Sequence, residues 1–188
     1  METNEIFDTL NDMVGRLNDL GVEYMVTGSV AMSNYVTARS TMDIDVIIEI
    51  EQSDLQRFER RFADDYYVDL ESIRRAKQHH SMFNVLNYTT GVKVDFITRK
   101  PNAFEAAKFH RRRRSKIDET EFWVISKEDL ILSKLDWAKD SHSERQFEDV
   151  RRLIESGADA AIINGEIEAQ GLGGVWEAYL EWMTRAEK

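Results

Sequence analysis

The stretch "GSVAMSNYVTARSTMDIDVII" (residues 28–48) decides how this chain folds, because it enters a buried strand with two aspartates one residue apart. Its last six residues are rich in β-branched side chains, which favour a strand. Side chains alternate between faces along a strand, so Asp43 and Asp45 project together while Ile44 points the other way. Two carboxylates this close repel each other unless a cation compensates. Mg²⁺ takes such oxygen ligands. The pair therefore predicts a metal site, and the alternative is a hydrated strand end.

A later strand supplies a third carboxylate. Residues 81–98 predict a hairpin of two apolar strands with its turn at Thr89-Thr90-Gly91. Asp95 lies inside the second strand, where an unpaired acid is costly to bury. If this strand lies beside the one with Asp43 and Asp45, the three carboxylates form a cluster. Such a cluster suits two-metal catalysis of a phosphoryl displacement.

The Gly28-Ser29 pair stands between a predicted strand (residues 22–28) and a short helix. A turn of this kind presents backbone N–H groups and a helix N-terminus, both of which favour a phosphate. Glycine allows close approach because it has no Cβ, and the Ser29 hydroxyl can donate a hydrogen bond. The alternative is an ordinary strand–helix turn capped by serine.

Composition limits the class of protein. The chain has 188 residues, of which 42% are hydrophobic, enough for one well-formed core or for one core with a helical extension. It has no cysteine, which excludes disulfides and thiolate metal sites. We expect a soluble, cytoplasmic protein without a membrane partner, because the N-terminus is unlike a signal peptide and no apolar run could span a bilayer. The net charge of −10 disfavours broad nucleic-acid binding, although basic residues cluster between Lys108 and Lys116.

Strands alternate with helices up to residue 125, and only helices follow. This order predicts an α/β (α+β) core with a mixed sheet flanked by helices over residues 1–125, and a C-terminal helical region over 126–188 packed on that core. Ser53 is expected to open one helix, with Gln56 completing a capping box. Another helix is expected over residues 103–114.

Several polar and aromatic residues have an ordinary structural interpretation. The histidines at 79 and 80 lack the partners that a zinc site needs. We expect three tryptophans, Trp137, Trp176 and Trp182, to pack between helices rather than to stack on bases. The run Arg111 to Arg114 predicts a solvated helix face, with contact to an anionic acceptor as the alternative.

Taken together, Gly28-Ser29, thirteen further residues, Asp43-Ile44-Asp45 and a distant Val94-Asp95-Phe96 resemble the signature of the nucleotidyltransferase superfamily with the DNA-polymerase-β-type fold. The likeness covers about residues 22 to 98. It implies transfer of a nucleoside monophosphate from an NTP to an acceptor hydroxyl, with release of pyrophosphate. By this likeness Asp43 and Asp45 bind two Mg²⁺ ions, with Mn²⁺ as an alternative. Asp95 binds the catalytic metal and helps to deprotonate the acceptor.

The rest of the chain resembles one branch of that superfamily, the abortive-infection AbiE toxin-type bacterial nucleotidyltransferases. The likeness rests on "ARSTMDID", with Arg39 and Thr41, and on "SKEDLILSKLDWAKD" followed by "RQFEDVRRLI". It implies that Arg39 and Thr41 belong to the nucleotide site and that Lys134 approaches the phosphates. Asp149 would then act near Lys134, as a base or as the group that orients it.

The function expected from the sequence is therefore Mg²⁺-dependent nucleotidyl transfer. The acceptor is left open between RNA (a tRNA 3′ end among them), a protein hydroxyl and a small molecule, and so is a role in a toxin–antitoxin pair. The alternative function is a noncatalytic nucleotide-binding or antitoxin-like interaction module with the same fold. The presence of all three acids argues against that alternative.

Overall fold

The computed structural model describes residues 3–37, 41–117, 119–141 and 143–186. The chain forms two compact units. The first comprises Met1–Ala31 and Ala38–Ile125, and the second comprises Met32–Thr37 and Ser126–Lys188. The sequence pattern had assigned residues 32–37 to the first region, and the structure groups them with the C-terminal helices.

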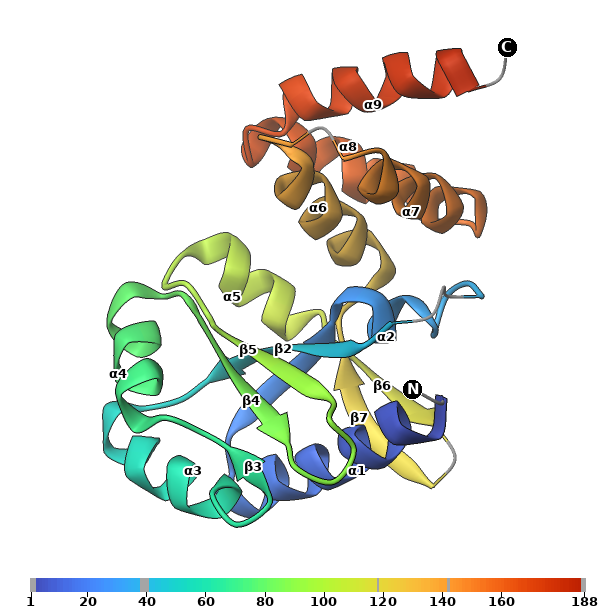
Figure 1. The fold of residues 1–188 in the computed structure, drawn as a ribbon. Helices are drawn as coiled ribbons and strands as arrows, with labels where there is room; N and C mark the ends of the chain where they lie inside the picture. The colour runs from blue at the N-terminus through green and yellow to red at the C-terminus, as the bar shows by residue number, and fades with distance from the viewer. Residues whose placement is uncertain (1–2, 38–40, 118, 142, 187–188) are drawn as a thin grey trace. The chain divides into compact units, whose positions relative to one another are not determined.

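The first unit is built on a mixed sheet. The described strands form one seven-stranded sheet in the order β3-β4-β5-β2-β1-β7-β6 (Figure 1). Their bounds are β1 Glu23–Thr27, β2 Asp43–Glu49, β3 Tyr66–Tyr67, β4 Met82–Asn87, β5 Lys93–Thr98, β6 Arg113–Ile117 and β7 Thr120–Val124. β2 pairs antiparallel with β1 and parallel with β5. The expected α/β fold with a mixed sheet is confirmed, and β4 and β5 form the expected hairpin.

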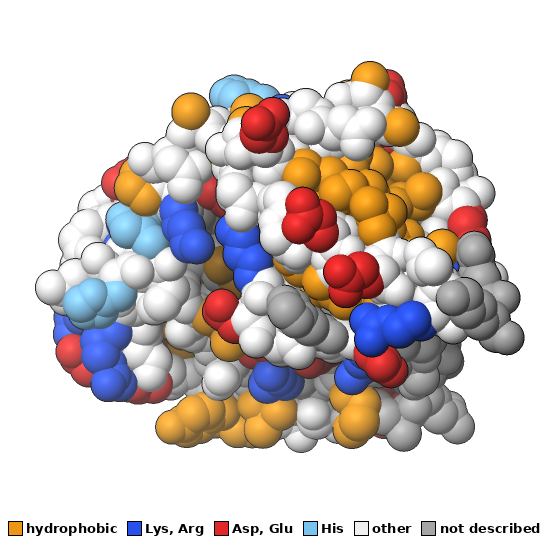
Figure 2. All heavy atoms as spheres, turned by 90° about the horizontal axis from the view of Figure 1, so that it is seen from above, with side chains coloured by type: hydrophobic (Ala, Val, Ile, Leu, Met, Phe, Trp, Pro, Cys, Tyr) orange, Lys and Arg blue, Asp and Glu red, His pale blue; other side chains and the backbone are white. Residues whose placement is uncertain are grey.

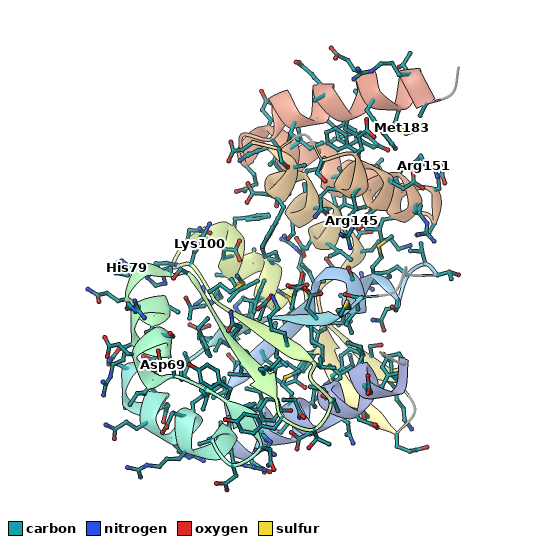
Figure 3. All side chains as sticks on the ribbon, in the orientation of Figure 1. Asp69, His79, Lys100, Arg145, Arg151 and Met183 are labelled. Atoms are coloured by element: carbon teal, nitrogen blue, oxygen red, sulfur yellow. The ribbon has the colours of Figure 1, made fainter. Side chains whose placement is uncertain are left out.

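Helices flank the sheet and build the second unit. In the first part of the chain they are α1 Thr3–Leu20, α2 Gly28–Met32, α3 Leu55–Phe62, α4 Leu70–His79 and α5 Ala103–His110. The second unit contains α6 Lys127–Ala138, α7 Glu144–Glu155, α8 Ala160–Ala169 and α9 Gly173–Ala186. Side-chain caps fix several starts. Figure 3 shows Asp69 and His79 at the two ends of α4, and the Asp69 carboxylate accepts hydrogen bonds from two backbone N–H groups of the first turn.

One face of the sheet is the core of the first unit. The helices α1, α3 and α4 lie against this face (Figure 1). It contains an aromatic cluster in which the Phe58 ring lies 5.2 Å from that of Phe96 on β5 and 5.6 Å from that of Phe83 on β4. Ile44 and Val46 of β2 are fully buried on the same side. Residues of opposite parity on β2 therefore point to the other face.

The helix expected over residues 103–114 is shorter than predicted, because α5 ends at His110. Arg113 and Arg114 instead begin β6, which pairs antiparallel with β7. The physical reason is tertiary. The guanidinium of Arg114 stacks over the Trp123 ring at 4.1 Å, and the backbone of this segment pairs with β7.

Two smaller predictions were also wrong. Ser53 lies in a 3₁₀ turn, Gln52–Asp54, and α3 then begins at Leu55 without a side-chain cap, so the expected capping box does not form. Trp137 on α6 is 61% exposed and does not pack between helices. Trp182 does pack between helices, because its ring lies 5.9 Å from that of Phe147 on α7. The Trp176 ring lies 5.1 Å from that of Tyr179 in its own helix, α9.

None of the described helices combines the length and the apolar character that a membrane span requires.

Candidate active site

The central strands bring the three predicted acids to one face of the sheet. In the parallel pair of β2 and β5, Asp45 lies directly opposite Asp95, and Asp43 lies opposite Lys93. In the antiparallel pair of β1 and β2, Thr27 lies opposite Asp45. Directly opposite residues share a face. The structure therefore places all three aspartates on the face away from the aromatic core, as strand alternation predicted.

A lysine lies between two of these carboxylates. The Nζ atom of Lys93 is 2.5 Å from Asp95 Oδ2 and 4.0 Å from Asp43 Oδ2. The hydrogen bond to Asp95 and the charges of the three aspartates raise the pKa of Lys93 above its ordinary value. Lys93 thus compensates part of the negative charge of the three acids.

This lysine changes the expected geometry. Among the described residues, no three carboxylate or histidine side chains converge closely enough to hold a metal ion as they stand. The sequence predicted carboxylates within bridging distance of a shared ion, and the structure differs in this respect. Asp95 is paired instead with the ammonium group of Lys93.

The donor atoms nevertheless fit a hard divalent cation. The Asp95 side chain is only 6% exposed. Its Oδ1 atom is buried and has no hydrogen-bond partner among the described residues. A buried carboxylate oxygen without a partner is costly, and a metal ion would relieve that cost. Asp43 is 42% exposed and so is open to a ligand from solvent.

Thr41 orients the first aspartate. Its hydroxyl donates a hydrogen bond of 2.8 Å to Asp43 Oδ1 and lies 3.3 Å from the Asp43 carbonyl oxygen. Thr41 was predicted as a nucleotide ligand, and in this structure it holds a carboxylate at the start of β2. Arg39, the other residue of that prediction, lies outside the described residues.

Gly28 fits against the second aspartate. Its φ angle is +64°, in the left-handed region that favours glycine. A Cβ atom built here would overlap Asp45 Oδ2 and lie 2.7 Å from Asp45 Cγ. The sequence suggested that this glycine leaves room for a phosphate. In the structure the room is taken by the Asp45 carboxylate, which stands against the turn from β1 into α2. Ser29 follows as the second residue of the five-residue α2 and is half-buried.

Lys134 and Asp149 belong to the second unit and are paired with each other. Lys134 Nζ on α6 donates to Asp149 Oδ2 on α7 over 2.6 Å, and the two side chains are 7% and 2% exposed. Gln146 Oε1 lies 3.4 Å from the same nitrogen. The pairing satisfies both charges inside the helical unit. The suggested contact of Lys134 with phosphates stays a prediction.

Sequence reasoning missed two residues beside the acids. Lys93 has the same strand parity as Asp95, but its pairing with the aspartates depends on the register of β5 against β2. Asn84 on β4 lies directly opposite Asp95 and is exposed. The alternation in "MFNVLN" shows that Asn84 faces away from the core, and only the hairpin register shows that it faces Asp95.

The fold defined by this sheet and these helices is that of the nucleotidyltransferases. A nucleotidyltransferase-like protein from Paracoccidioides brasiliensis superposes with a TM-score of 0.56 and 14% identity, covering 95% of this chain and 94% of that one. The antibiotic-resistance factor ANT(2″)-Ia gives 0.56 and 12% identity, covering 100% of this chain and 97% of that one. The lincosamide antibiotic adenylyltransferase LnuA, solved with lincomycin bound, gives 0.51 and 15%, covering 81% and 96%.

No protein-family model matches the sequence, and no curated protein sequence matches it. At these identities the solved structures establish a shared fold, and the chemistry has to be argued from this chain's own residues.

Proposed function

We propose that the protein is a nucleotidyltransferase that moves a nucleoside monophosphate from an NTP to an acceptor hydroxyl. One observation carries the proposal: the parallel register of β2 and β5 sets Asp45 opposite Asp95, with Asp43 on the same sheet face. The Oδ1 atom of Asp95 supports the proposal. It is buried and has no hydrogen-bond partner among the described residues, and a bound cation would offset the cost of burying it.

The aspartates have distinct roles in this proposal. Asp43 and Asp45 hold Mg²⁺, or Mn²⁺ in its place, and Asp95 is a third ligand. Bound there, the metal would polarise the triphosphate and neutralise the charge that develops during transfer. The acceptor oxygen forms a bond to the α-phosphorus while the bond from that phosphorus to the pyrophosphate oxygen breaks. Asp95 accepts the hydroxyl proton, and pyrophosphate leaves.

Lys93 is proposed to compensate the charge of the aspartates before metal and nucleotide bind. Its ammonium compensates Asp95 and Asp43 until a metal–nucleotide complex arrives, and it then releases Asp95. Its side chain is 42% exposed, so it can swing toward solvent or pair with a phosphate oxygen without crossing the core.

The nucleotide side of the site is proposed on β1, α2 and the segment before β2. Gly28 keeps Asp45 close to the turn, and Thr41 keeps Asp43 in place. Ser29 and Arg39 are proposed as phosphate ligands, by the resemblance described above. Lys134 is proposed as a further phosphate ligand oriented by Asp149, and this assignment requires the metal–nucleotide complex to compete with the pairing of those two residues.

The chemical class of the acceptor is also part of the proposal. Two of the similar folds are solved with antibiotics or their adenylyl derivatives, namely lincomycin in LnuA and adenylyl-2″-tobramycin in ANT(2″)-Ia. These favour a small-molecule acceptor over a tRNA 3′ end or a partner protein. An AbiE-type role in a toxin–antitoxin pair would require one of the latter two.

Transfer chemistry is tested by incubating the protein with each α-³²P-labelled NTP and Mg²⁺ or Mn²⁺, and measuring pyrophosphate release and labelled product. Because the acceptor is not known, a mixture of bulk tRNA, a protein extract and a pool of hydroxyl compounds serves as acceptor. Asp45→Asn should abolish release. Asp64→Asn, which removes an exposed acid in the turn after α3, is the matched control and should leave release unchanged.

A noncatalytic nucleotide-binding module is the second candidate, and one observation favours it. The pair between Lys93 and Asp95 already compensates the charge of the most buried of the three acids. Saturable NTP binding without pyrophosphate release under any acceptor condition would support this candidate and exclude the enzyme.

A further inference from the structure

The sheet face that carries the aspartates continues onto β4 and β3. Asn84 of β4 lies opposite Asp95, and Leu86 lies opposite Lys93. Tyr67 of β3 in turn lies opposite Leu86. Because paired residues share a face, Asn84, Leu86 and Tyr67 extend from the acidic cluster toward the edge of the sheet. We call these three residues the edge platform.

The apolar members of the edge platform are exposed, which is unusual for paired strands. Tyr67 is 58% exposed and Leu86 is 42% exposed. Two neighbouring apolar side chains, Met82 at 47% and Tyr88 at 61%, are also exposed. A group of large apolar residues left uncovered beside a polar cluster is typical of a binding surface.

The order of the strands indicates that this surface lies on the acceptor side of the aspartates rather than on the nucleotide side. Across β4, β5, β2 and β1, the residues run from Asn84 through Asp95 and Asp45 to Gly28. The nucleotide is proposed on the Gly28 side. The acceptor must approach the reacting phosphorus from the side opposite the leaving group. It therefore enters over Asp95, which is the side of the edge platform.

The charge of this side identifies the class of acceptor. β3 and β4 contain no charged residue at all. Arg113 and Arg114 lie on β6, at the opposite edge of the sheet from β3. On the one face of the molecule that Figure 2 shows, Lys and Arg side chains are scattered among acidic ones. A polyanion needs its phosphates neutralised. None of the three edge-platform residues carries a charge, and Lys93, which lies opposite Leu86, is already paired with Asp95.

We infer that the edge platform is the acceptor site, and that it takes an uncharged small molecule that has a hydroxyl group next to an apolar face. The apolar face lies on Leu86 and Tyr67, and the Asn84 amide hydrogen-bonds the hydroxyl-bearing part toward Asp95. This inference rests on the proposed function for its geometry, and its test reads binding rather than transfer.

Three matched probes separate the two features of the acceptor. Phenyl β-D-glucoside carries an apolar ring and hydroxyls without charge. Methyl β-D-glucoside lacks the ring, and phenyl β-D-glucuronide adds a carboxylate. Binding is followed through the methyl NMR signals of Met82 and Leu86 in the full chain. A single-stranded RNA with an ACCA 3′ end is titrated in parallel.

The expected result is saturable binding of the phenyl glucoside, at least about tenfold tighter than either partner compound, with shifts at both methyl groups. The double variant Tyr67→Ser/Leu86→Ser should weaken it by about tenfold. The control Ile162→Ser/Leu180→Ser removes apolar residues of similar exposure, 40% and 47%, from the second unit and should not weaken it. Melting curves verify that all variants fold.

Equal affinity for the phenyl and methyl glucosides would overturn the inference, and so would tighter binding of the RNA at the same methyl groups. Neither result depends on pyrophosphate release. If binding is as expected but no NTP is turned over under any condition, the proposed function fails while the edge platform stands as a ligand site.

Discussion

The Asp45 carboxylate packs directly against Gly28 at the end of β1. Most of the described glycines with positive φ, such as Gly91 at φ +67°, have no heavy atom within 4 Å of the position that a Cβ atom would take. Gly28 instead faces a carboxylate, so both its backbone conformation and its missing side chain are required. The identity of this residue is therefore tied to the position of a proposed metal ligand.

Replacing Gly28 by alanine should cost more than the same change at Gly91. Gly91→Ala introduces only backbone strain, roughly 1 kcal/mol of unfolding free energy. Gly28→Ala adds an overlap with Asp45 and should cost about 1–2 kcal/mol more. Urea unfolding measures both. In an Asp45→Ala background the extra cost should disappear, since the two changes are coupled. Equal costs at the two glycines would show that Asp45 moves away freely.

Lys93 and Asp95 form the other close contact of the site. Removing one partner of a buried pair leaves an uncompensated charge and costs about 3–5 kcal/mol. The Lys93 side chain is 42% exposed, which reduces this cost. The pair therefore offers a measurable link between the stability of the metal-free protein and its affinity for a cation.

Lys93→Met should destabilise the metal-free protein by about 1–2 kcal/mol, because Asp95 loses its counter-charge. It should also tighten Mn²⁺ binding, since the cation no longer competes with the ammonium. Thermal melting without metal and Mn²⁺ titration followed by electron paramagnetic resonance check the two effects. Lys116→Met, which removes an exposed lysine of β6, is the control. Weaker Mn²⁺ binding in Lys93→Met would mean that the lysine is part of the cation site.

At the scale of elements, the ends of β2 and β5 opposite the aspartates are held by a different ion pair. Glu49 accepts hydrogen bonds from two nitrogens of Arg99, at 2.5 Å and 2.7 Å. These bonds lower the pKa of Glu49 below its ordinary value of 4.5. The pair joins two strands whose register sets Asp45 against Asp95, so it supports the site from a distance.

This pair makes part of the stability of the protein pH-dependent. Because the folded pKa of Glu49 is lowered, the stabilisation is complete above about pH 5 and is lost as the pH falls through the folded pKa. Glu49→Gln should cost roughly 0.5–1 kcal/mol at pH 7, a small value because the carboxylate is partly exposed. At pH 3 the difference in unfolding urea concentration between wild type and variant should be smaller than at pH 7. An undiminished difference at pH 3 would contradict this account.

The sequence could predict those elements whose pattern lies within a single segment of the chain. Strand alternation in "TMDIDVII" and "VKVDFI" is local, and it identified the buried residues and the shared face of the aspartates. β6 was missed because "RRRRSKI" has no apolar alternation and becomes a strand only through its pairing with β7 and stacking on Trp123. The Lys93 pairing and the position of Asn84 depend on register between strands distant in sequence, which no local pattern contains.

At the scale of the whole molecule, the chain joins a sheet-based unit to a helical one. The helical unit has its own buried ion pair, Lys134 with Asp149, between α6 and α7. On the surface of α7, Arg151 (Figure 3) bonds to Glu148 and Glu155, which links successive turns of the helix. The buried pair is thus an energetic feature of the second unit, whatever its part in nucleotide binding.

Lys134→Met should lower the unfolding free energy of the protein by about 3–5 kcal/mol, because Asp149 is left charged and buried. The double variant Lys134→Met/Asp149→Leu should recover most of that loss, since no charge remains unpaired. Calorimetry measures both. NTP affinity of the stable double variant then tests the proposed role of Lys134. Unchanged affinity would show that Lys134 is structural and would remove it from the nucleotide site.

The central claim is that Asp43, Asp45 and Asp95 form the metal site of a nucleotidyltransferase. The most direct measurement is anomalous diffraction from crystals of the protein grown with Mn²⁺ and α,β-methylene-ATP. The account predicts manganese bound by Asp43 and Asp45, Asp95 bound to metal, and the Lys93 ammonium displaced from Asp95. Manganese bound elsewhere, with the pair between Lys93 and Asp95 intact beside the nucleotide, would contradict it.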